Sequence, residues 1–233
     1  MTRTLREETV RHQPRQESEK ASFSLLDLTH ISEVRRLQEK VKEEVQQQEL
    51  LQELTEEELE FVLEARGIVV GVYAKENLIA FRAMMYPKAD DPENLGKDLG
   101  LDTERVAHQE ISCVHPDYQG NGLQKKMGET IMEEFRDERP DLIHVLCTVH
   151  PENEASLRDK FHHGMVIVEL REKYAGKLRY IMYLPLQETL HVNAEKIISV
   201  PIEDIDQQKA LLKENYIGYD YSNGKILYGK RDE

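Results

Sequence analysis

The chain has 233 residues, which fits one large domain or two small ones and allows a sizeable buried core. Its 31 lysines and arginines are outnumbered by 45 aspartates and glutamates, which gives a formal net charge of −14. Proteins that bind nucleic acid or membrane surfaces electrostatically use clustered basic side chains, so this balance argues against both kinds of partner. No run of eighteen apolar residues occurs, so no membrane span is expected.

Only two cysteines occur, Cys113 and Cys147, and both lie in apolar stretches. This usage is typical of a reducing compartment, and residues 1–8 carry no apolar leader segment, so a cytoplasmic location is expected. So few cysteines exclude a disulfide scaffold. Metal ligands at a recognisable spacing are also lacking, so no metal site is expected.

The N-terminal part of the chain is predicted to be an arm followed by helices. Residues 1–20 mix both charges with almost no apolar periodicity and are predicted to be flexible. Thr55 and Glu58 have the spacing of a capping box that starts a short helix, with Leu54 and Leu59 placed as its hydrophobic staple. Between these segments, apolar residues recur every three or four positions and predict an amphipathic helix: Ile31, Val34, Leu37, Val41 and Val45.

Residues 21–186 are predicted to form one mixed α/β domain. After the helices, its expected elements are strands over 68–73 and 78–86, a long loop over 87–105, a strand over 106–114, a helix over 123–136, a strand over 142–149, a helix over 152–162, and strands near 165–170 and 180–186. Residues 187–233 are predicted to be a strand-helix-hairpin extension packed on the same domain, because some forty residues bury little core alone. Asn223-Gly224 suits a type I′ turn in that hairpin.

The most informative stretch joins the strand over 106–114 to the helix over 123–136. Pro116 forces a turn, Gly120 and Gly122 follow, and a helix begins. Glycines let backbone N–H groups face a ligand, and a helix N-terminus adds partial positive charge, so this stretch predicts a pyrophosphate site. The spacing is not that of a Walker loop, and Lys125 stands where a dinucleotide fingerprint has its third glycine. A plain glycine-rich turn is the alternative.

The run Val114-His115-Pro116-Asp117-Tyr118-Gln119-Gly120-Asn121-Gly122-Leu123 resembles the glycine motif of the GNAT superfamily of acyl-CoA-dependent N-acetyltransferases. Gln119 and Gly122 match that pattern, whereas Gln124 stands where the family usually has glycine or alanine. Asn153-Glu154-Ala155-Ser156 and Gly164-Met165 resemble the family's downstream helix, and the order of elements agrees over 31–186. The resemblance implies a central mixed, splayed sheet flanked by helices.

The resemblance also implies that acetyl-CoA is the co-substrate. Its pantetheine would pair with backbone groups of Ser112 and Val114 in the manner of an added strand. Asn153 occupies a position whose amide often contacts CoA or the acetyl end in this family, and it can equally be a helix N-cap. The pyrophosphate would lie on the amides of Gln119, Gly120, Asn121, Gly122, Leu123, Gln124 and Lys125.

Acetyl transfer needs a base, because a protonated amine has no lone pair with which to attack a thioester. Strand alternation predicts that Val106, His108, Glu110, Ser112 and Val114 share one face, with Cys113 on the other as a packed thiol. Family members often place the base, or a base with a water relay, at the positions of His108 and Glu110. The alternatives are that Glu110 pairs with a cation and that His108 is a core residue.

The general acid is not assigned. Lys160 stands where many family members have a tyrosine, and the candidates on neighbouring strands are Tyr174, Tyr180 and Tyr183.

The sequence thus predicts an N-acetyltransferase that moves acetyl from acetyl-CoA to a primary amine of a small molecule or peptide by direct attack in a ternary complex. The alternative is a degenerate member that holds acetyl-CoA as a sensor, which the departures at Gln124 and Lys160 favour. The negative net charge favours a cationic acceptor through electrostatic steering. The sequence is also compatible with a homodimer.

Overall fold

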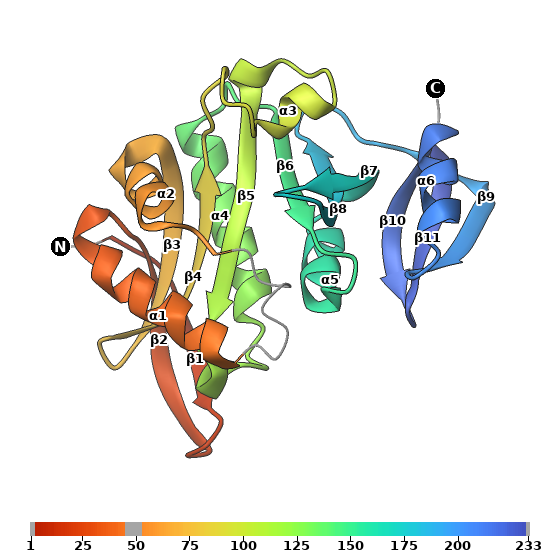
Figure 1. Cartoon of the computed structure of the whole chain (residues 1–233). Coiled ribbons are helices and arrows are strands. Elements are labelled where there is room, and N and C mark those ends of the chain that lie inside the picture. The colour runs from red at the N-terminus through yellow and green to blue at the C-terminus, as the bar shows by residue number, and fades with distance from the viewer. Residues whose placement is uncertain (1–2, 45–52, 232–233) are drawn as a thin grey trace. The chain divides into compact units, whose positions relative to one another are not determined.

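The computed structural model describes residues 3–44 and 53–231, with the side chains of 194–195 left out (Figure 1). The chain divides into two compact units. The first comprises Met1–Pro87 and His108–Pro140, and the second comprises Lys88–Ala107 and Asp141–Glu233. The predicted domain over 21–186 is therefore shared between the two units, and the C-terminal extension belongs to the second.

The first unit contains an antiparallel sheet in the order β1-β2-β3-β4-β5. Its strands are β1 Thr4–His12, β2 Glu17–Leu25, β3 Gly67–Ala74, β4 Asn77–Met85 and β5 Val106–Val114, of which the first two residues belong to the second unit.

Strands β1 and β2 show that the prediction of a flexible arm over residues 1–20 was wrong. β1 is the outermost strand of this sheet, and most of its side chains are polar and accessible, which hid the period of two. Its buried apolar residue, Val10, lies in register with Glu19 of β2. On β2, Ala21 and Phe23 complete the buried face.

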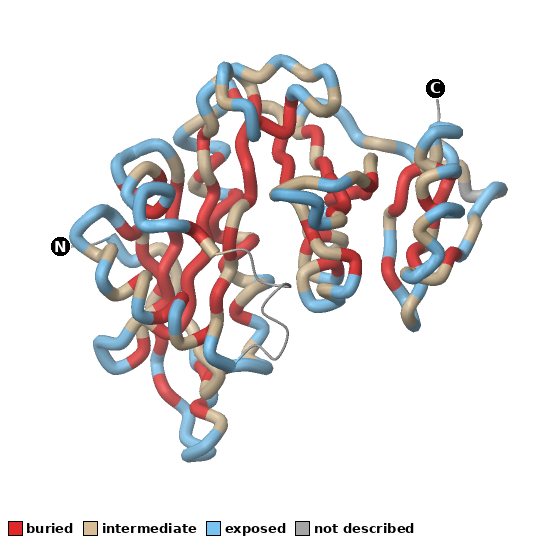
Figure 2. Tube along the Cα trace, in the orientation of Figure 1, coloured by how far each residue is buried: buried red, intermediate tan, exposed pale blue. Residues whose placement is uncertain are grey.

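Helices cover both faces of this sheet (Figure 2). The helices α1 Ile31–Glu44, α2 Glu56–Phe61 and the adjoining η3 Val62–Arg66 contribute to a core that also includes Phe81 of β4. Helix α4 Leu123–Glu138 packs against β3 and β4. The predicted helical stripe is confirmed at Val34, Leu37 and Val41, which are buried, whereas Val45 lies outside the described residues.

The predicted capping box is present at the start of α2. Thr55 Oγ1 accepts from the Glu58 amide at 3.2 Å, and Glu58 Oε2 accepts from the Thr55 amide at 2.7 Å. Leu54 and Leu59 are both buried in the core, as their positions in the predicted staple require. Local sequence is enough to fix this helix start because all four residues lie within six positions of one another.

The second unit has a sheet in the order β6-β8-β7-β10-β11-β9. Its strands are β6 His144–Val149, β7 Val166–Lys173, β8 Lys177–Pro185, β9 Val192–Pro201, β10 Tyr216–Ser222 and β11 Lys225–Arg231, and its helices are α3 Leu95–Asp98, η4 Thr103–Arg105, α5 Glu154–His162 and α6 Ile205–Lys213. The described strand pairs within it are antiparallel. Asn223 and Gly224 both have positive φ, as a type I′ turn requires.

The predicted mixed α/β fold class is confirmed, with mostly antiparallel strands flanked by helices. The strand, helix and hairpin predicted after residue 186 are β9, α6 and β10–β11, and β10 pairs with β7 where Gly218 faces Ile167. The remaining short helices are η1 Leu28–His30 and η5 Pro116–Tyr118. Among the described residues, no helix is long and apolar enough to cross a membrane.

We expect Thr55→Ala to lower the free energy of unfolding by about 1 kcal/mol, because the Glu58 amide loses its capping acceptor. Urea titration measures the change. Thr55→Ser keeps a hydroxyl at the same place and is the matched control, so it should stay close to wild type. Equal losses in the two variants would show that the hydroxyl does not stabilise this helix start.

Candidate functional site

The predicted glycine loop lies between β5 and α4 in the first unit. It follows η5 and contains Gly120 and Gly122, whose φ angles are 79° and 68°. These left-handed angles favour glycine over residues with a Cβ. Gly122 is the N-cap of α4, and no side chain among the described residues caps this helix. A Cβ at Gly122 would meet no atom within 4 Å, so the helix begins beside open space.

The charges at the start of α4 also favour an anion. Its first turn contains no acidic residue, although acidic side chains normally stabilise a helix N-terminus. It contains Lys125 instead, which is exposed and makes no ion pair with any described residue, whereas Lys126 is paired with Glu8 at 3.0 Å. A cation at this helix end is unfavourable by itself and becomes favourable when an anion binds.

Arg82 on β4 adds a buried positive charge beneath the same turn. Its side chain is 1% exposed, and it donates to the Gln124 carbonyl at 3.1 Å and to Gln109 Oε1 at 2.7 Å. The sequence analysis missed this residue. The available signal was an arginine in the middle of an otherwise apolar strand.

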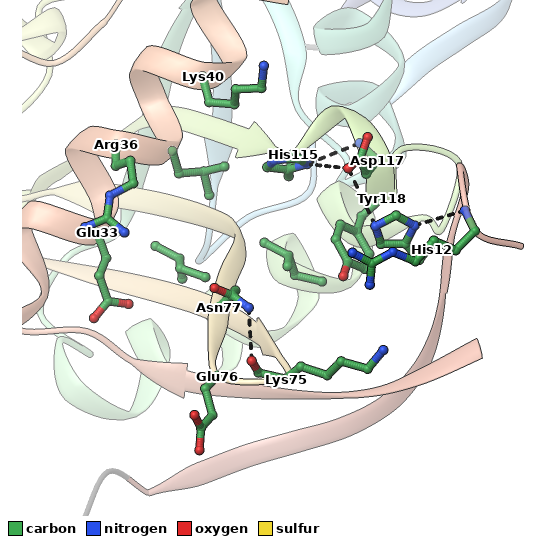
Figure 3. A pocket seen from close by; sticks show the side chains of 14 residues that line it. His12, Glu33, Arg36, Lys40, Lys75, Glu76, Asn77, His115, Asp117 and Tyr118 are labelled. Carbon is green, nitrogen blue, oxygen red and sulfur yellow. Dashed lines mark hydrogen bonds and ion pairs between the residues drawn. The ribbon is translucent and has the colours of Figure 1, made fainter. Parts of the chain in front are cut away.

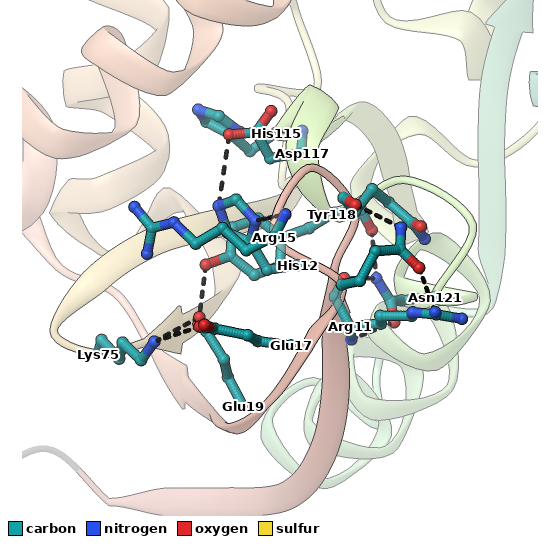
Figure 4. Close-up of polar contacts among 12 residues, drawn as sticks. Arg11, His12, Arg15, Glu17, Glu19, Lys75, His115, Asp117, Tyr118 and Asn121 are labelled. Atoms are coloured by element: carbon teal, nitrogen blue, oxygen red, sulfur yellow. Dashed lines mark hydrogen bonds and ion pairs between the residues drawn. The ribbon is translucent and has the colours of Figure 1, made fainter.

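The turn between β1 and β2 holds the glycine loop through Asn121 (Figure 4). Asn121 Oδ1 accepts from the Arg11 amide at 2.7 Å, and Asn121 Nδ2 donates to the carbonyls of Arg11 at 2.9 Å and Tyr118 at 2.8 Å. The Asn121 side chain therefore already bonds to protein backbone groups. What Asn121 can offer a ligand is its backbone amide, which is the group that the sequence analysis assigned.

Gln13 and Glu19 make further contacts with the same segment. We call these contacts, together with those of Asn121, the hairpin latch. The Gln13 amide donates to the Asp117 carbonyl at 2.7 Å, and Gln13 Nε2 donates to the Gln119 carbonyl at 3.0 Å. Buried Glu19 accepts from Tyr118 Oη at 2.9 Å and from Lys75 Nζ at 2.6 Å. The latch was missed because residues 1–20 were expected to be flexible.

Strand β5 contains a bulge that changes which residues share a face. Arg82 pairs with Ser112 and Met84 with Gln109, so two steps along β4 correspond to three along β5. Ser112, the partner of Arg82, therefore lies on the α4 face. His108 pairs with Met85, which packs against the core on the α1 face. The prediction that His108, Glu110, Ser112 and Val114 share one face was therefore wrong.

Cys113 was expected on the face opposite to Glu110. It lies in the α1-side core with Ile111, on the face that His108 occupies. Its burial is complete and raises the pKa of its thiol. The prediction of a packed thiol is confirmed, and Cys147 in the second unit is likewise buried and not part of a disulfide.

His108 and Glu110 remain neighbours across the bulge. His108 Nδ1 lies 3.3 Å from Glu110 Oε1, with side chains 6% and 23% exposed. A carboxylate that is partly accessible and backed by a buried imidazole can accept a proton from a bound molecule and share it with a second group. The structure thus brings together the two residues proposed from sequence for base chemistry.

Backbone groups of Ser112 and Val114 point away from β4. The His115 amide bonds to the Ile79 carbonyl, and in an antiparallel pair the hydrogen-bonded residues alternate, so Ser112 and Val114 have the opposite orientation. Ser112 Oγ is also buried without a hydrogen-bond partner among the described residues. A buried hydroxyl without a partner is costly and fits a site that a polar ligand completes.

The remaining predicted residues lie in the second unit. Asn153 is the N-cap of α5, where its Oδ1 accepts from the Ser156 amide at 3.0 Å, so the helix-cap alternative is confirmed. Lys160 is 5% exposed and lies 3.6 Å from Asp159.

The candidate acids are hydrogen-bonded within the same unit. Tyr180 donates to Gln208 at 2.6 Å, Tyr183 lies 2.9 Å from His144 Nδ1, and Tyr174 lies 3.3 Å from Thr148.

Acid should weaken the hairpin latch through Glu19. Bonds from Lys75 and then Tyr118 hold the pKa of this carboxyl below its usual value near 4.5. The unfolded chain therefore binds more protons near that pH, so the stabilisation is complete above about pH 4.5 and is lost as pH falls. We expect the difference in Tm between wild type and Glu19→Gln to narrow below about pH 4.5. Thermal unfolding with exposed Glu17→Gln as control measures it, and a constant difference would contradict the assignment.

The sequence matches no protein-family model and no curated protein. Solved structures do match. An N-acetyltransferase from Staphylococcus aureus Mu50 has a TM-score of 0.56 at 17% identity, over 72% of this chain and 99% of that one. A GNAT-family acetyltransferase from Streptococcus pneumoniae has a TM-score of 0.53 at 17% identity, over 71% and 99%.

A putative acetyltransferase from Salmonella typhimurium, solved with its cofactor acetyl-CoA, has a TM-score of 0.53 at 16% identity, over 75% of this chain and 98% of that one. These matches cover nearly the whole of each solved chain. The chain has the fold of the GNAT N-acetyltransferases.

Proposed function

We propose that the chain is an N-acetyltransferase that moves acetyl from acetyl-CoA to a primary amine of a small molecule or peptide by direct attack in a ternary complex. The observation that carries the proposal is the start of α4, where left-handed Gly122 leaves the helix without a side-chain cap beside open space. Within a GNAT fold, this end of the helix suits the pyrophosphate of CoA.

Residues of the first unit fit the parts of acetyl-CoA. The amides of 119–125 would hold the pyrophosphate, with Lys125 and Arg82 adding positive charge. Ser112 and Val114 present backbone groups to which an extended pantetheine could bond as an added strand, and Ser112 Oγ offers a buried polar group that lacks a partner. When bound, acetyl-CoA supplies the activated acetyl thioester.

The chain's own part in the chemistry is to remove a proton from the amine. Glu110 is accessible enough to accept it, and His108 Nδ1 lies 3.3 Å from Glu110 Oε1 and can share the charge. This distance supports a relay of two residues over a single base. The net charge of −14 favours cationic acceptors by steering them toward the protein.

A sensor that binds acetyl-CoA without turnover is the second candidate. It is favoured by the position where a tyrosine is usual in the family, because Lys160 stands there, 5% exposed and 3.6 Å from Asp159. Thiol release with a panel of polyamines, aminoglycosides, amino acids and peptides separates the two functions. CoA release above the background without amine supports the enzyme, and its absence with acetyl-CoA still bound supports the sensor.

We expect Gly122→Glu to weaken acetyl-CoA binding at least about tenfold, because a carboxylate would face the pyrophosphate. Isothermal calorimetry measures the affinity. Gly122→Gln introduces a side chain of the same size and the same strain at a positive φ. The difference between the two losses of affinity therefore measures the effect of the negative charge. Unchanged affinity in a folded Gly122→Glu protein would show that the loop is only a turn.

We expect Glu110→Gln to lower kcat by about a hundredfold or more, with acetyl-CoA affinity within about threefold of wild type. The loss should shrink at high pH, where more of the amine is already neutral. Because His108 and Glu110 are in contact, the double variant with His108→Gln should be no worse than the poorer single variant.

A pH–rate profile on any accepted amine decides between catalysis and binding by Glu110. If Glu110 only binds a cationic acceptor, Glu110→Gln should raise the acceptor KM and leave kcat near normal. Full turnover with an unshifted profile would remove Glu110 from the mechanism.

A further inference from the structure

The first unit contains a pocket of about 580 Å³ that is distinct from the glycine loop (Figure 3). Its walls come from α1, the β3–β4 turn with the start of β4, the β1–β2 turn, and η5 with the residue before it. None of residues 119–125 lines it, and neither do His108 and Glu110. The lining is His12, Arg15, Glu33, Arg36, Leu37, Lys40, Lys75, Glu76, Asn77, Leu78, Ile79, His115, Asp117 and Tyr118.

Basic side chains outnumber acidic ones in this lining, although the whole chain carries a net charge of −14. Two of the acidic groups are already engaged. Glu33 accepts from Tyr73 Oη at 2.9 Å, and Asp117 lies 3.6 Å from His12 Nε2 and 3.9 Å from His115 Nδ1. The lining thus holds four lysine and arginine side chains against three carboxylates.

Arg36 and Arg15 are the cations that stay available. Both are exposed, and neither guanidinium makes an ion pair or hydrogen bond with any described residue. Figure 3 shows Arg36 and His12 on opposite sides of the pocket, and Figure 4 shows Arg15 beside His12. Two guanidiniums on separate walls can hold one anionic group through paired N–H donors, which suits phosphate and carboxylate oxygens.

Lysines of the pocket are less available. Lys75 is bonded to buried Glu19 at 2.6 Å, as part of the hairpin latch. Lys40 lies 3.2 Å from Glu44 and 3.8 Å from Glu43, but its side chain is 43% exposed, and such accessible pairs hold a lysine only weakly. Lys40 can therefore turn toward an anion, which places three cationic side chains within the pocket's reach.

The pocket also has an apolar part. Leu78 is partly exposed and packs against the α1-side core, and Leu37 and Ile79, which are 4% and 2% exposed, line the same pocket. A site with an apolar floor and guanidiniums at its rim suits a molecule with an anionic group on an apolar body, and a bare inorganic ion would leave the floor uncovered.

We propose that this pocket binds a small organic anion, a phosphate or carboxylate carried on an apolar body, at a site separate from that for acetyl-CoA. The anion bonds to Arg36 and Arg15, and its apolar body lies over Leu37, Leu78 and Ile79. The pocket wall includes Asp117 and Tyr118, which directly precede the glycine loop, so an occupant contacts the segment that the hairpin latch holds.

Calorimetry with phenyl phosphate, benzoate and benzyl alcohol tests the proposal on the full chain saturated with acetyl-CoA, which keeps the probes out of that site. We expect saturable binding of both anions, weakened by salt, and none of benzyl alcohol. The tighter anion identifies the preferred acidic group. Absence of saturable binding by either anion, or equal binding of benzyl alcohol, would overturn the proposal.

Variants then locate the site. Arg36→Gln and Arg15→Gln should each weaken binding of the tighter anion about tenfold. Arg35→Gln is the matched control, because Arg35 precedes Arg36 on the same helix, pairs with Glu56 at 2.5 Å and does not line the pocket. An equal loss of anion affinity in the control, or no loss in Arg36→Gln and Arg15→Gln, would overturn the assignment of the anion to this pocket.

The same variants separate this pocket from the acetyl-CoA site. With no probe present, Arg36→Gln and Arg15→Gln should bind acetyl-CoA as wild type does. A loss of acetyl-CoA affinity that is absent with dephospho-CoA would assign the pocket to the 3′-phosphate of CoA and overturn a separate site. Because these measurements use binding alone, they can fail or succeed independently of acetyl transfer.

Discussion

Three hydrogen bonds from the Asn121 side chain fix the loop on which every proposed pyrophosphate contact depends. The loop must hold Gly120 and Gly122 at positive φ and leave the start of α4 without a side-chain cap. Backbone of this kind has few internal constraints, and its amides are useful to an anion only if they stay pointed at it. The hairpin latch supplies the constraint from outside the loop, through β1 and β2, so the N-terminal strands support the proposed binding site.

The bulge in β5 places residues of one strand that have different proposed roles on two faces of the sheet. Ser112 lies on the α4 face, near the positively charged start of that helix, whereas His108 lies on the α1 face. A regular strand would have placed both on one face. By inserting one residue, the bulge separates the groups suited to hold a cofactor from the groups suited to move a proton, within a few residues of chain.

Positive charge is concentrated at particular places in an acidic protein. Arg82 is buried beneath the first turn of α4, Lys125 stands at its surface, and Arg36 borders the separate pocket. Cations gathered at these places attract anions locally, while the net charge of −14 governs the approach of molecules from a distance. The proposed anionic co-substrate and cationic acceptor are compatible with this distribution, because local cations act at short range and the net charge acts at long range.

Local sequence determined the features that depend on neighbours along the chain: the capping box at Thr55 and Glu58, the buried stripe of α1, the turn at Asn223-Gly224 and the glycine loop before α4. The fold class and the order of the main elements from α1 onward followed from the same patterns, whereas β1 and β2 did not. Only the tertiary structure decided the latch between Arg11 and Asn121, which are 110 positions apart, the depth of Arg82, and the faces of β5. The spacing of apolar residues predicts which side chains face inward, but a bulge shifts that spacing by one residue. A hydrogen bond between distant segments produces no periodic pattern in either segment.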